Sequence, residues 1–234
     1  DKSILKKCEY LMHFATTDAS NFDADFENTY KTNVIDSIEL IDSAIKNGVK
    51  KILIAGSCYE YGKTGEIFKT LSTNAKLLPI GYYAYSKASF YLQLQNLLKK
   101  TKKNIKVFYA RFFQVYGEYE KKTRLYPTVI SAAKSNTKIS IKNPHYLRDF
   151  IDVKTASILT LEKFFKNTKK IAISNIATGK PTSIIKFSNS TWKKYNKRKS
   201  KISYNKSKSK NGIAYDEWCG YYCIPRNYHE DTHA

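Results

Sequence analysis

A tyrosine and a lysine four residues apart could form a proton-transfer pair. On a helix, residues at this spacing lie one turn apart on the same face, with Cβ atoms about 5–6 Å apart. An ammonium group there favours the phenolate and lowers the tyrosine pKa from its usual value of about 10, which suits acid–base catalysis on a sugar or alcohol hydroxyl. The spacing alone does not identify a site, because the chain has 19 Tyr and four such pairs. The four pairs are Tyr59/Lys63, Tyr83/Lys87, Tyr195/Lys199 and Tyr204/Lys208.

The sequence around Tyr83 and Lys87 distinguishes this pair from the others. The pair opens a predicted amphipathic helix that runs to about residue 100, and it follows Ser57 by 26 residues. Ser57 comes directly after the apolar run that starts at Lys51 and ends in Gly56, so its hydroxyl could hydrogen-bond the reacting oxygen and orient the phenol. The sequence therefore predicts Ser57, Tyr83 and Lys87 as catalytic residues.

Short apolar runs alternate with amphipathic stretches along the chain. Strands that alternate with helices indicate crossover connections and a parallel sheet, so an α/β fold is expected. Parallel sheets bind ligands at the carboxyl ends of their strands. We expect Asn33 to cap the first of the helices. The predicted strands are 10–15, 51–55, 105–110 and 171–174, and the predicted helices are 33–47, 83–100, 128–133 and 155–165.

The composition is that of a globular protein. The chain has 234 residues, 42% of them hydrophobic, and 4 Cys. No run approaches the roughly 18 consecutive apolar residues that a membrane span requires, and the first residues do not resemble a signal peptide. We therefore expect a cytoplasmic protein with reduced thiols and no membrane partner.

The formal net charge of +21 raises the alternative of a nucleic-acid partner, because basic proteins bind phosphate backbones. However, 36 of the 41 cations are Lys and only 5 are Arg, the residue that suits phosphate and base recognition. We predict no specific nucleic-acid binding. The segment Lys186 to Lys210 has ten cations and no acidic residue, and we expect a solvated face or a mobile loop there.

Seven short motifs follow one another along the chain. They are His13 to Ala15, Asn33 at a predicted helix start, Gly56-Ser-Cys-Tyr-Glu-Tyr-Gly62, Pro79 to Lys87, Arg111-Phe-Phe-Gln-Val-Tyr-Gly117, Arg148-Asp-Phe-Ile-Asp-Val153 and Asn175-Ile-Ala-Thr-Gly179. In this order they resemble the NAD-dependent epimerase/dehydratase family, the extended short-chain dehydrogenases/reductases that act on nucleotide sugars. The resemblance covers roughly residues 10–185.

The resemblance implies a role for each matched residue. Tyr83 would exchange the proton of the sugar hydroxyl, Ser57 would bind the same oxygen, and Lys87 would hold the cofactor ribose and lower the pKa of Tyr83. The implied cofactor is NAD or NADP, and the residues implied to line it are Ala15, Thr16, Asn33, Tyr83, Lys87 and Phe113. The residues implied to bind a nucleotide-diphosphate sugar are Ser57, Gln114, where the family usually has Asn, and Arg148, whose planar donors suit a diphosphate.

The resemblance also implies a Rossmann-like three-layer sandwich that lacks its N-terminal strands. The family's glycine-rich phosphate motif and the acidic residue after it do not occur in the chain, so we expect a fragment that binds the dinucleotide poorly. The strand at 10–14 would then be an uncovered edge. On this interpretation residues 1–185 form a partial NAD(P)-binding catalytic domain, and residues 186–234 are a lysine-rich segment and atypical tail left from a substrate-binding lobe.

The implied function is an NAD(P)-dependent nucleotide-sugar epimerase or reductase that works through a 4-keto sugar, in surface polysaccharide or deoxysugar biosynthesis. Dehydration is disfavoured because Cys58 and Tyr59 stand where the dehydratases have Asp-Glu. A homodimer is left open. The alternative is a truncated, non-catalytic fragment whose basic surface binds polyanions.

Several other polar residues have simpler interpretations. We expect a structural role for His13, a small buried side chain at Cys58, and loop anchors at Asp149 and Asp152. The tail contains four residues of zinc-ligand type, but the gap of five residues between the second and the third is too short for a zinc finger, and we predict no metal site. These four residues are Cys219, Cys223, His229 and His233.

Overall fold

The computed structural model describes residues 2–17, 19, 25–67 and 70–204. The described chain forms two compact units, which we call the sheet unit (2–64, 72–112 and 157–176) and the second unit (65–71, 113–156 and 177–204). Each unit is built from segments that are separated in the sequence. The cysteines and histidines of the tail lie outside the described residues.

The sheet unit is built on four parallel strands in the order β1-β2-β3-β8. In β2 and β3 most side chains are buried, as expected for central strands covered on both faces. Ile52, Leu53 and Ile54 are fully buried and pair in register with 107–109. The parallel α/β fold is thus confirmed, with strands at the four predicted places. The bounds are β1 Tyr10–His13, β2 Lys51–Ser57, β3 Lys106–Phe112 and β8 Ile171–Ile176.

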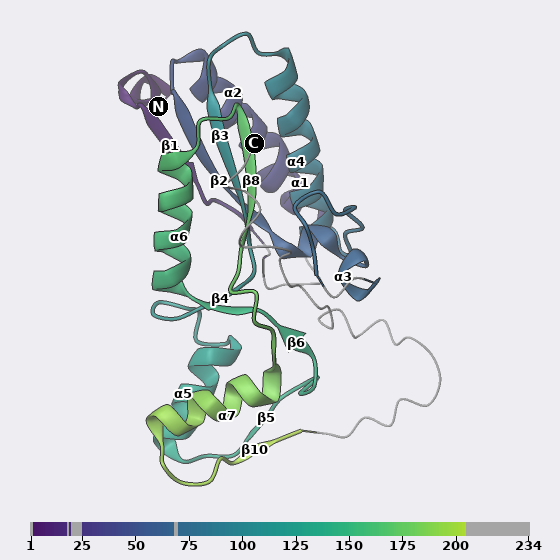
Figure 1. Cartoon of the computed structure of the whole chain (residues 1–234), viewed down its shortest axis with the longest axis vertical. Coiled ribbons are helices and arrows are strands. Elements are labelled where there is room, and N and C mark those ends of the chain that lie inside the picture. Colours follow the sequence, from purple (N-terminus) through teal and green to yellow (C-terminus); the bar gives the residue numbers. More distant parts are fainter. Residues whose placement is uncertain (1, 18, 20–24, 68–69, 205–234) are drawn as a thin grey trace. The chain divides into compact units, whose positions relative to one another are not determined.

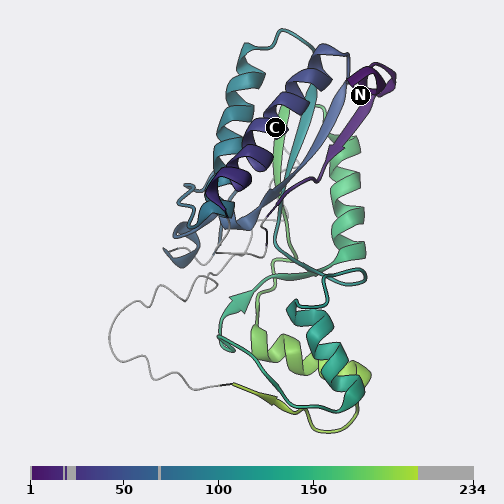
Figure 2. The same cartoon turned by 180° about the vertical axis from the view of Figure 1, so that it is seen from behind.

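Helices cover both faces of this sheet and give it three layers. Figures 1 and 2, which view it from opposite sides, show α1, α2 and α4 on one face and α6 on the other. The apolar core between the first face and the sheet includes Ile41, Phe90, Leu94 and Val107. The bounds are α1 Phe26–Tyr30, α2 Ser37–Lys46, α4 Tyr82–Lys100 and α6 Val153–Lys166.

The first helical segment begins earlier than predicted. Asp25 is its N-cap and accepts a hydrogen bond from the Glu27 amide, so the expectation that Asn33 caps this helix is wrong. Asn33 lies within a π-helical stretch, η2 (Lys31–Asp36), that joins α1 to α2. Such wide turns occur mostly as single insertions within α-helices and are frequent at functional sites. The amide of Asn33 is thereby used for contacts inside the protein instead of for capping.

Strand β1 lies at one edge of the sheet. Within the described residues it pairs only with β2, which agrees with the expected edge position. Every second side chain along β1 and just after it is about half exposed: the exposed fractions of Tyr10, Met12 and Phe14 are 44–51%.

The second unit contains two helices and pairs of short strands. In α7 (Ile184–Tyr195) Trp192 is fully buried against Val129 and Ala133 of α5 (Leu125–Ser135). Lys186, Lys193 and Lys194 are exposed, which agrees with the expected solvated face, while the other side of the helix packs against α5; the alternative of a loop is wrong for 186–195. The remaining elements are η1 Lys2–Lys7, η3 Cys58–Tyr61, α3 Thr64–Ile67, β4 Gln114–Tyr116, β5 Ile139–Ser140, β6 Leu147–Arg148, β7 Phe150–Asp152, β9 Thr182–Ser183 and β10 Ile202–Ser203.

None of the helices in the described part of the chain combines the length and the apolar character that crossing a bilayer requires.

Candidate functional site

The structure brings the three predicted catalytic residues into one unit, at the carboxyl end of the sheet. Ser57 is the last residue of β2, and Tyr83 and Lys87 lie in the first two turns of α4. The side chains of Ser57 and Thr16 lie close enough to the Tyr83 phenol to act on its pKa. Among the described Tyr/Lys pairs at this spacing, it is the pair in α4 that has both members on one helix.

A short helical turn fixes the position of Ser57. Ser57 caps η3: its Oγ accepts a hydrogen bond from the Tyr59 amide at 3.2 Å, and Glu60 Oε1 accepts one from the Ser57 amide at 2.7 Å. This reciprocal pattern is a capping box. Gly62 ends the turn with φ of 49°, and a Cβ there would lie 1.8 Å from the carbonyl oxygen of Leu78, so only glycine fits.

Burial raises the pKa of Tyr83 to about 12, against the opposing effect of the Ser57 and Thr16 side chains. The phenol is therefore protonated near pH 7. We expected Lys87 to lower this pKa, but burial is the largest effect on it and its net direction is upward. Tyr83 is therefore prepared to donate a proton.

Lys87 is a buried cation with an exposed fraction of only 4%. Burial lowers its pKa to about 8, and the charge of Glu60 opposes this shift. No described residue accepts a hydrogen bond from its ammonium group. Its three N–H donors thus remain for a ligand.

Asn33 connects the loop after β1 to the helix that carries Tyr83 and Lys87. Its Oδ1 accepts hydrogen bonds from Thr16 Oγ1 at 3.0 Å and from the Thr17 amide at 2.9 Å. Its Nδ2 donates to the Thr17 carbonyl at 3.2 Å and to Ser86 Oγ at 3.0 Å. Ser86 Oγ in turn donates to the Tyr83 carbonyl at 2.8 Å. The buried amide of Asn33 is engaged at both ends inside the protein.

His13 is held inside the same unit. Its Nε2 lies 3.0 Å from Ser37 Oγ, and burial, followed by the charge of Lys87, lowers the pKa of His13 to about 4. A neutral, buried imidazole agrees with the structural role expected for it. Cys58, as expected, is a small buried side chain.

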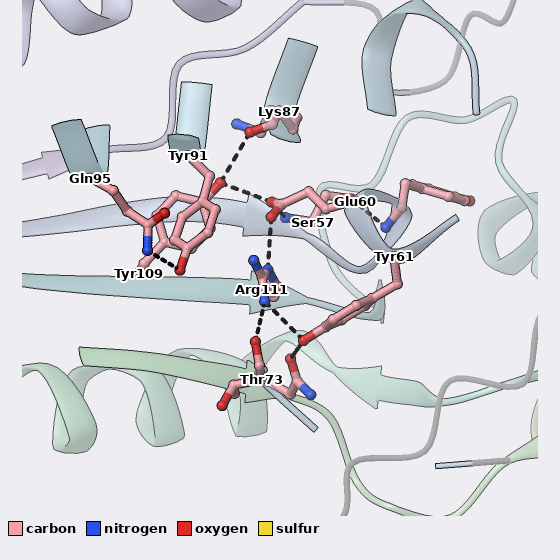
Figure 3. A network of polar contacts seen from close by, with 11 residues as sticks. Ser57, Glu60, Tyr61, Thr73, Lys87, Tyr91, Gln95, Tyr109 and Arg111 are labelled. Carbon is pink, nitrogen blue, oxygen red and sulfur yellow. Dashed lines mark hydrogen bonds and ion pairs between the residues drawn. The ribbon is translucent and has the colours of Figure 1, made fainter. Parts of the chain in front are cut away.

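A buried ion pair lies next to the predicted site, and the sequence did not indicate it (Figure 3). Arg111 Nε donates to Glu60 Oε2 at 2.7 Å, and both side chains are at most 1% exposed. Arg111 also donates through one terminal nitrogen to Tyr61 Oη at 3.1 Å and to the Thr73 carbonyl at 2.9 Å. Glu60 accepts a further hydrogen bond from Tyr109 Oη at 2.8 Å. Glu60 and Arg111 each lie in one of the seven motifs described above. Their pairing could not be predicted, because the two residues are 51 positions apart in the sequence.

The surroundings of this pair keep Arg111 charged. Burial disfavours the cation, but the attraction of Glu60 and of Tyr61 raises the pKa of Arg111 above its usual value. Its guanidinium carbon also lies 4.7–4.8 Å from the ring centroids of Tyr61 and Tyr91. Burial raises the pKa of Glu60, and the charge of Arg111 is the largest opposing effect.

The other predicted site residues lie in separate places. Ala15 is exposed in the loop after β1, within the sheet unit. Phe113, Gln114 and Arg148 belong to the second unit: Phe113 is buried, Gln114 is half-buried in β4, and Arg148 is buried in β6, where it donates to the Leu147 carbonyl at 2.8 Å.

The two aspartates near Arg148 serve as anchors, as expected. Asp149 accepts hydrogen bonds from the amides of Thr178 and Gly179, at 2.8 and 2.7 Å. Asp152 accepts one from the Lys154 amide at 2.9 Å at the start of α6.

One curated relative is the ADP-L-glycero-D-manno-heptose-6-epimerase of Brachyspira hyodysenteriae. It is 30% identical over 141 residues, which make up 58% of this chain and 43% of the relative. The chain thus spans less than half the length of this relative.

Solved structures of nucleotide-sugar enzymes have a similar fold. A complex of MoeE5 with UDP-glucose and NAD superimposes with a TM-score of 0.80 at 18% identity, over 97% of this chain and 73% of that one. The UDP-N-acetylglucosamine 4-epimerase of Methanobrevibacter ruminantium M1, in complex with UDP-N-acetylmuramic acid, gives a TM-score of 0.69 at 25% identity, over 80% of this chain and 60% of that one.

The sequence model of the NAD dependent epimerase/dehydratase family matches residues 2–177, about three quarters of the chain. This range contains all the motifs around Ser57, Tyr83 and Lys87. The chain therefore belongs to the NAD dependent epimerase/dehydratase family.

Proposed function

We propose that the protein is an NAD(P)-dependent nucleotide-sugar epimerase or reductase that works through a 4-keto sugar. The observation that carries this proposal is the grouping of Ser57, at the end of β2, with Tyr83, whose phenol the Ser57 side chain acts on, and with Lys87 one turn further along the same helix. These groups lie at the carboxyl end of a parallel sheet, where such folds bind their ligands.

Each residue has a separate task in the proposed reaction. In the reducing direction, the neutral phenol of Tyr83 donates its proton to the keto oxygen of the sugar, and Ser57 Oγ donates a hydrogen bond to that oxygen. In the oxidising direction, Tyr83 takes the proton of the sugar hydroxyl. NAD(P), when bound, supplies the hydride acceptor and donor for the sugar carbon.

The residues present fit a dinucleotide on one side of this site. The buried Lys87 ammonium has donors that no described residue uses, and ribose hydroxyls are suitable acceptors. Ala15 and Thr16 are exposed on the loop that Asn33 secures, and Thr16 acts on the Tyr83 phenol. We propose that these residues hold the cofactor.

For the substrate we propose a nucleotide-diphosphate sugar, bound through Gln114 and Arg148. A guanidinium can donate two parallel hydrogen bonds to a diphosphate. The named relatives support this class, since two of the solved structures contain UDP-sugars and the curated relative is an ADP-heptose epimerase. A role in surface polysaccharide or deoxysugar synthesis is part of the same proposal.

The direct test replaces Tyr83 by Phe and follows turnover of UDP-glucose and ADP-L-glycero-D-manno-heptose with NAD or NADP. Proton NMR detects the epimer, and absorbance detects the reduced cofactor. We expect Tyr83→Phe to lower turnover by about 10²- to 10⁴-fold, because the acid–base group is lost. The matched control is Tyr85→Phe, an exposed tyrosine of the same helix that should leave turnover unchanged.

Two outcomes would contradict the proposal. Unchanged turnover in Tyr83→Phe would remove the acid–base role of this residue. A folded wild-type protein that neither binds nor converts these sugars, but binds heparin in a salt-dependent way, would favour the non-catalytic alternative.

A further inference from the structure

We propose that Glu60 is a positioning residue of this site, whose carboxylate fixes the backbone at Ser57 and favours the cationic form of Lys87, and that Arg111 keeps this carboxylate ionised inside the protein. The inference rests on the proposed function only in so far as Ser57 and Lys87 act in catalysis. Its electrostatic part concerns the protein alone.

The first step is the contact with Ser57. Glu60 Oε1 accepts a hydrogen bond from the Ser57 amide at 2.7 Å, and the side chain of Glu60 is fully buried. Because Ser57 both ends β2 and starts η3, this bond sets where the Ser57 hydroxyl meets Tyr83. Loss of the acceptor would leave the serine amide without its capping partner.

The second step is the charge of Glu60. Its two oxygens accept hydrogen bonds from three donors, namely the Ser57 amide, Tyr109 Oη at 2.8 Å and Arg111 Nε at 2.7 Å. Two of these groups, the Ser57 amide and Arg111 Nε, can only donate; they engage both carboxyl oxygens, and one of them is a cation. The arrangement therefore fits a carboxylate, which the adjacent guanidinium stabilises.

The third step is the proximity of this carboxylate to Lys87. Tyr109 Oη lies 2.8 Å from Glu60 Oε1 and 3.5 Å from the carbonyl oxygen of Lys87, so the carboxylate lies next to the helical turn that carries the lysine (Figure 3). The other titratable groups around Lys87 are His13 on β1, Tyr83 on α4 and Tyr109 on β3, and all three are neutral near pH 7. Among these described groups, Glu60 is thus the anion that acts on Lys87.

The test measures the titration midpoint of Lys87 directly. Lysine labelled with ¹³C at Cε is followed by NMR across pH in the full chain, and the Lys87 signal is assigned by its absence in Lys87→Arg. In Glu60→Gln we expect the midpoint to fall by about one pH unit, because the opposite charge has been removed.

Two controls separate this charge effect from others. Glu9→Gln removes one exposed carboxylate of the same unit, so it tests the effect of net charge, and it should leave the midpoint unchanged. Tyr109→Phe removes a hydrogen bond of the network but keeps the carboxylate, and it should move the midpoint much less than Glu60→Gln does.

A second variant keeps the test decisive if Glu60→Gln does not fold. Glu60→Gln/Arg111→Gln removes both charges of the buried pair together, so neither is left without its partner, and it should also shift the Lys87 midpoint downward. A folded variant of either kind whose Lys87 midpoint equals that of the wild type would overturn the proposal.

Activity supplies an independent readout. In Glu60→Gln, the limb of the pH–rate profile that reports Lys87 should move to lower pH together with the NMR midpoint, whereas Tyr83→Phe should lower the rate without moving the Lys87 midpoint. If the midpoint moves while no nucleotide sugar is converted, the proposed function fails and the electrostatic role of Glu60 stands.

Discussion

Arg111 and Lys87 are both cations buried in the sheet unit, yet their surroundings have opposite effects on them. Arg111 has a carboxylate at 2.7 Å, two further acceptors and three aromatic rings, and its pKa is raised. Lys87 has no described hydrogen-bond acceptor, and burial lowers its pKa to about 8. Burial alone therefore does not determine the state of a cation; the number and geometry of its partners do.

This difference separates a structural role from a functional one. A charge that is fully paired holds neighbouring strands and loops together, while a charge without partners lowers stability and is retained where a ligand supplies the partners. By this criterion Arg111 belongs to the scaffold and Lys87 to the site.

The largest effect on stability should follow from removal of Arg111, the fully paired cation. Arg111→Gln leaves Glu60 buried without a guanidinium, and we expect it to lower the free energy of unfolding by about 3–5 kcal/mol. Urea denaturation followed by circular dichroism measures this. Adding Glu60→Gln should restore part of the loss, and a loss below about 1 kcal/mol would contradict the scaffold role.

Removal of Lys87, the buried cation without a described hydrogen-bond partner, should instead stabilise the protein. Lys87→Met should raise the free energy of unfolding at pH 7 by about 2 kcal/mol. The pKa of Lys87 is about 8 in the folded protein, below the ordinary value of 10.5 that the unfolded chain has, so folding disfavours the protonated lysine. Wild-type stability should accordingly rise between about pH 8 and 10.5, and the variant should lack this rise. Lys100→Met, at an exposed position of α4, is the control that should change little. A destabilised Lys87→Met would show that the lysine has partners in the folded protein.

A smaller effect is expected on the pKa of His13, which reports the charge of the neighbouring Lys87. Its folded-state pKa of about 4 lies below the unfolded value, so this residue contributes stability that is lost as the pH falls from about 6.5 to 4. Since the charge of Lys87 is the second cause of this low pKa, Lys87→Met should raise the His13 midpoint by about half a pH unit. NMR titration of the imidazole signals, assigned with His13→Gln, checks this. An unchanged midpoint would leave burial as the sole cause.

Elements with a strong periodic or apolar signal could be predicted from the sequence. The strands were found because central parallel strands are continuous apolar runs, and α4 was found because its apolar positions recur at helical spacing. The grouping of Ser57, Tyr83 and Lys87 followed from the rule that residues after parallel strands share one edge of the sheet.

The failures have physical causes that a single sequence does not display. The lysines of α7 concealed one apolar face that ends in Trp192, and Asn33 has the composition of a cap although Asp25 takes that place. The pairing of Glu60 with Arg111 depends on the register of β2 and β3, which places distant residues side by side. The pKa of Tyr83 depends on the balance of burial and charge, which spacing cannot give.

The π-helical stretch at 31–36 makes the segment before it sensitive to length. A turn of this kind holds one residue more than a regular turn, so deletion of a single residue there would allow an unbroken α-helix to form. Successive residues of an α-helix differ by about 100° in direction. Such a deletion would therefore rotate Phe26 and Tyr30, whose ring centroids now lie 4.7 Å apart, away from their present side of the helix. The loss of an exposed residue from a surface loop would instead be absorbed locally.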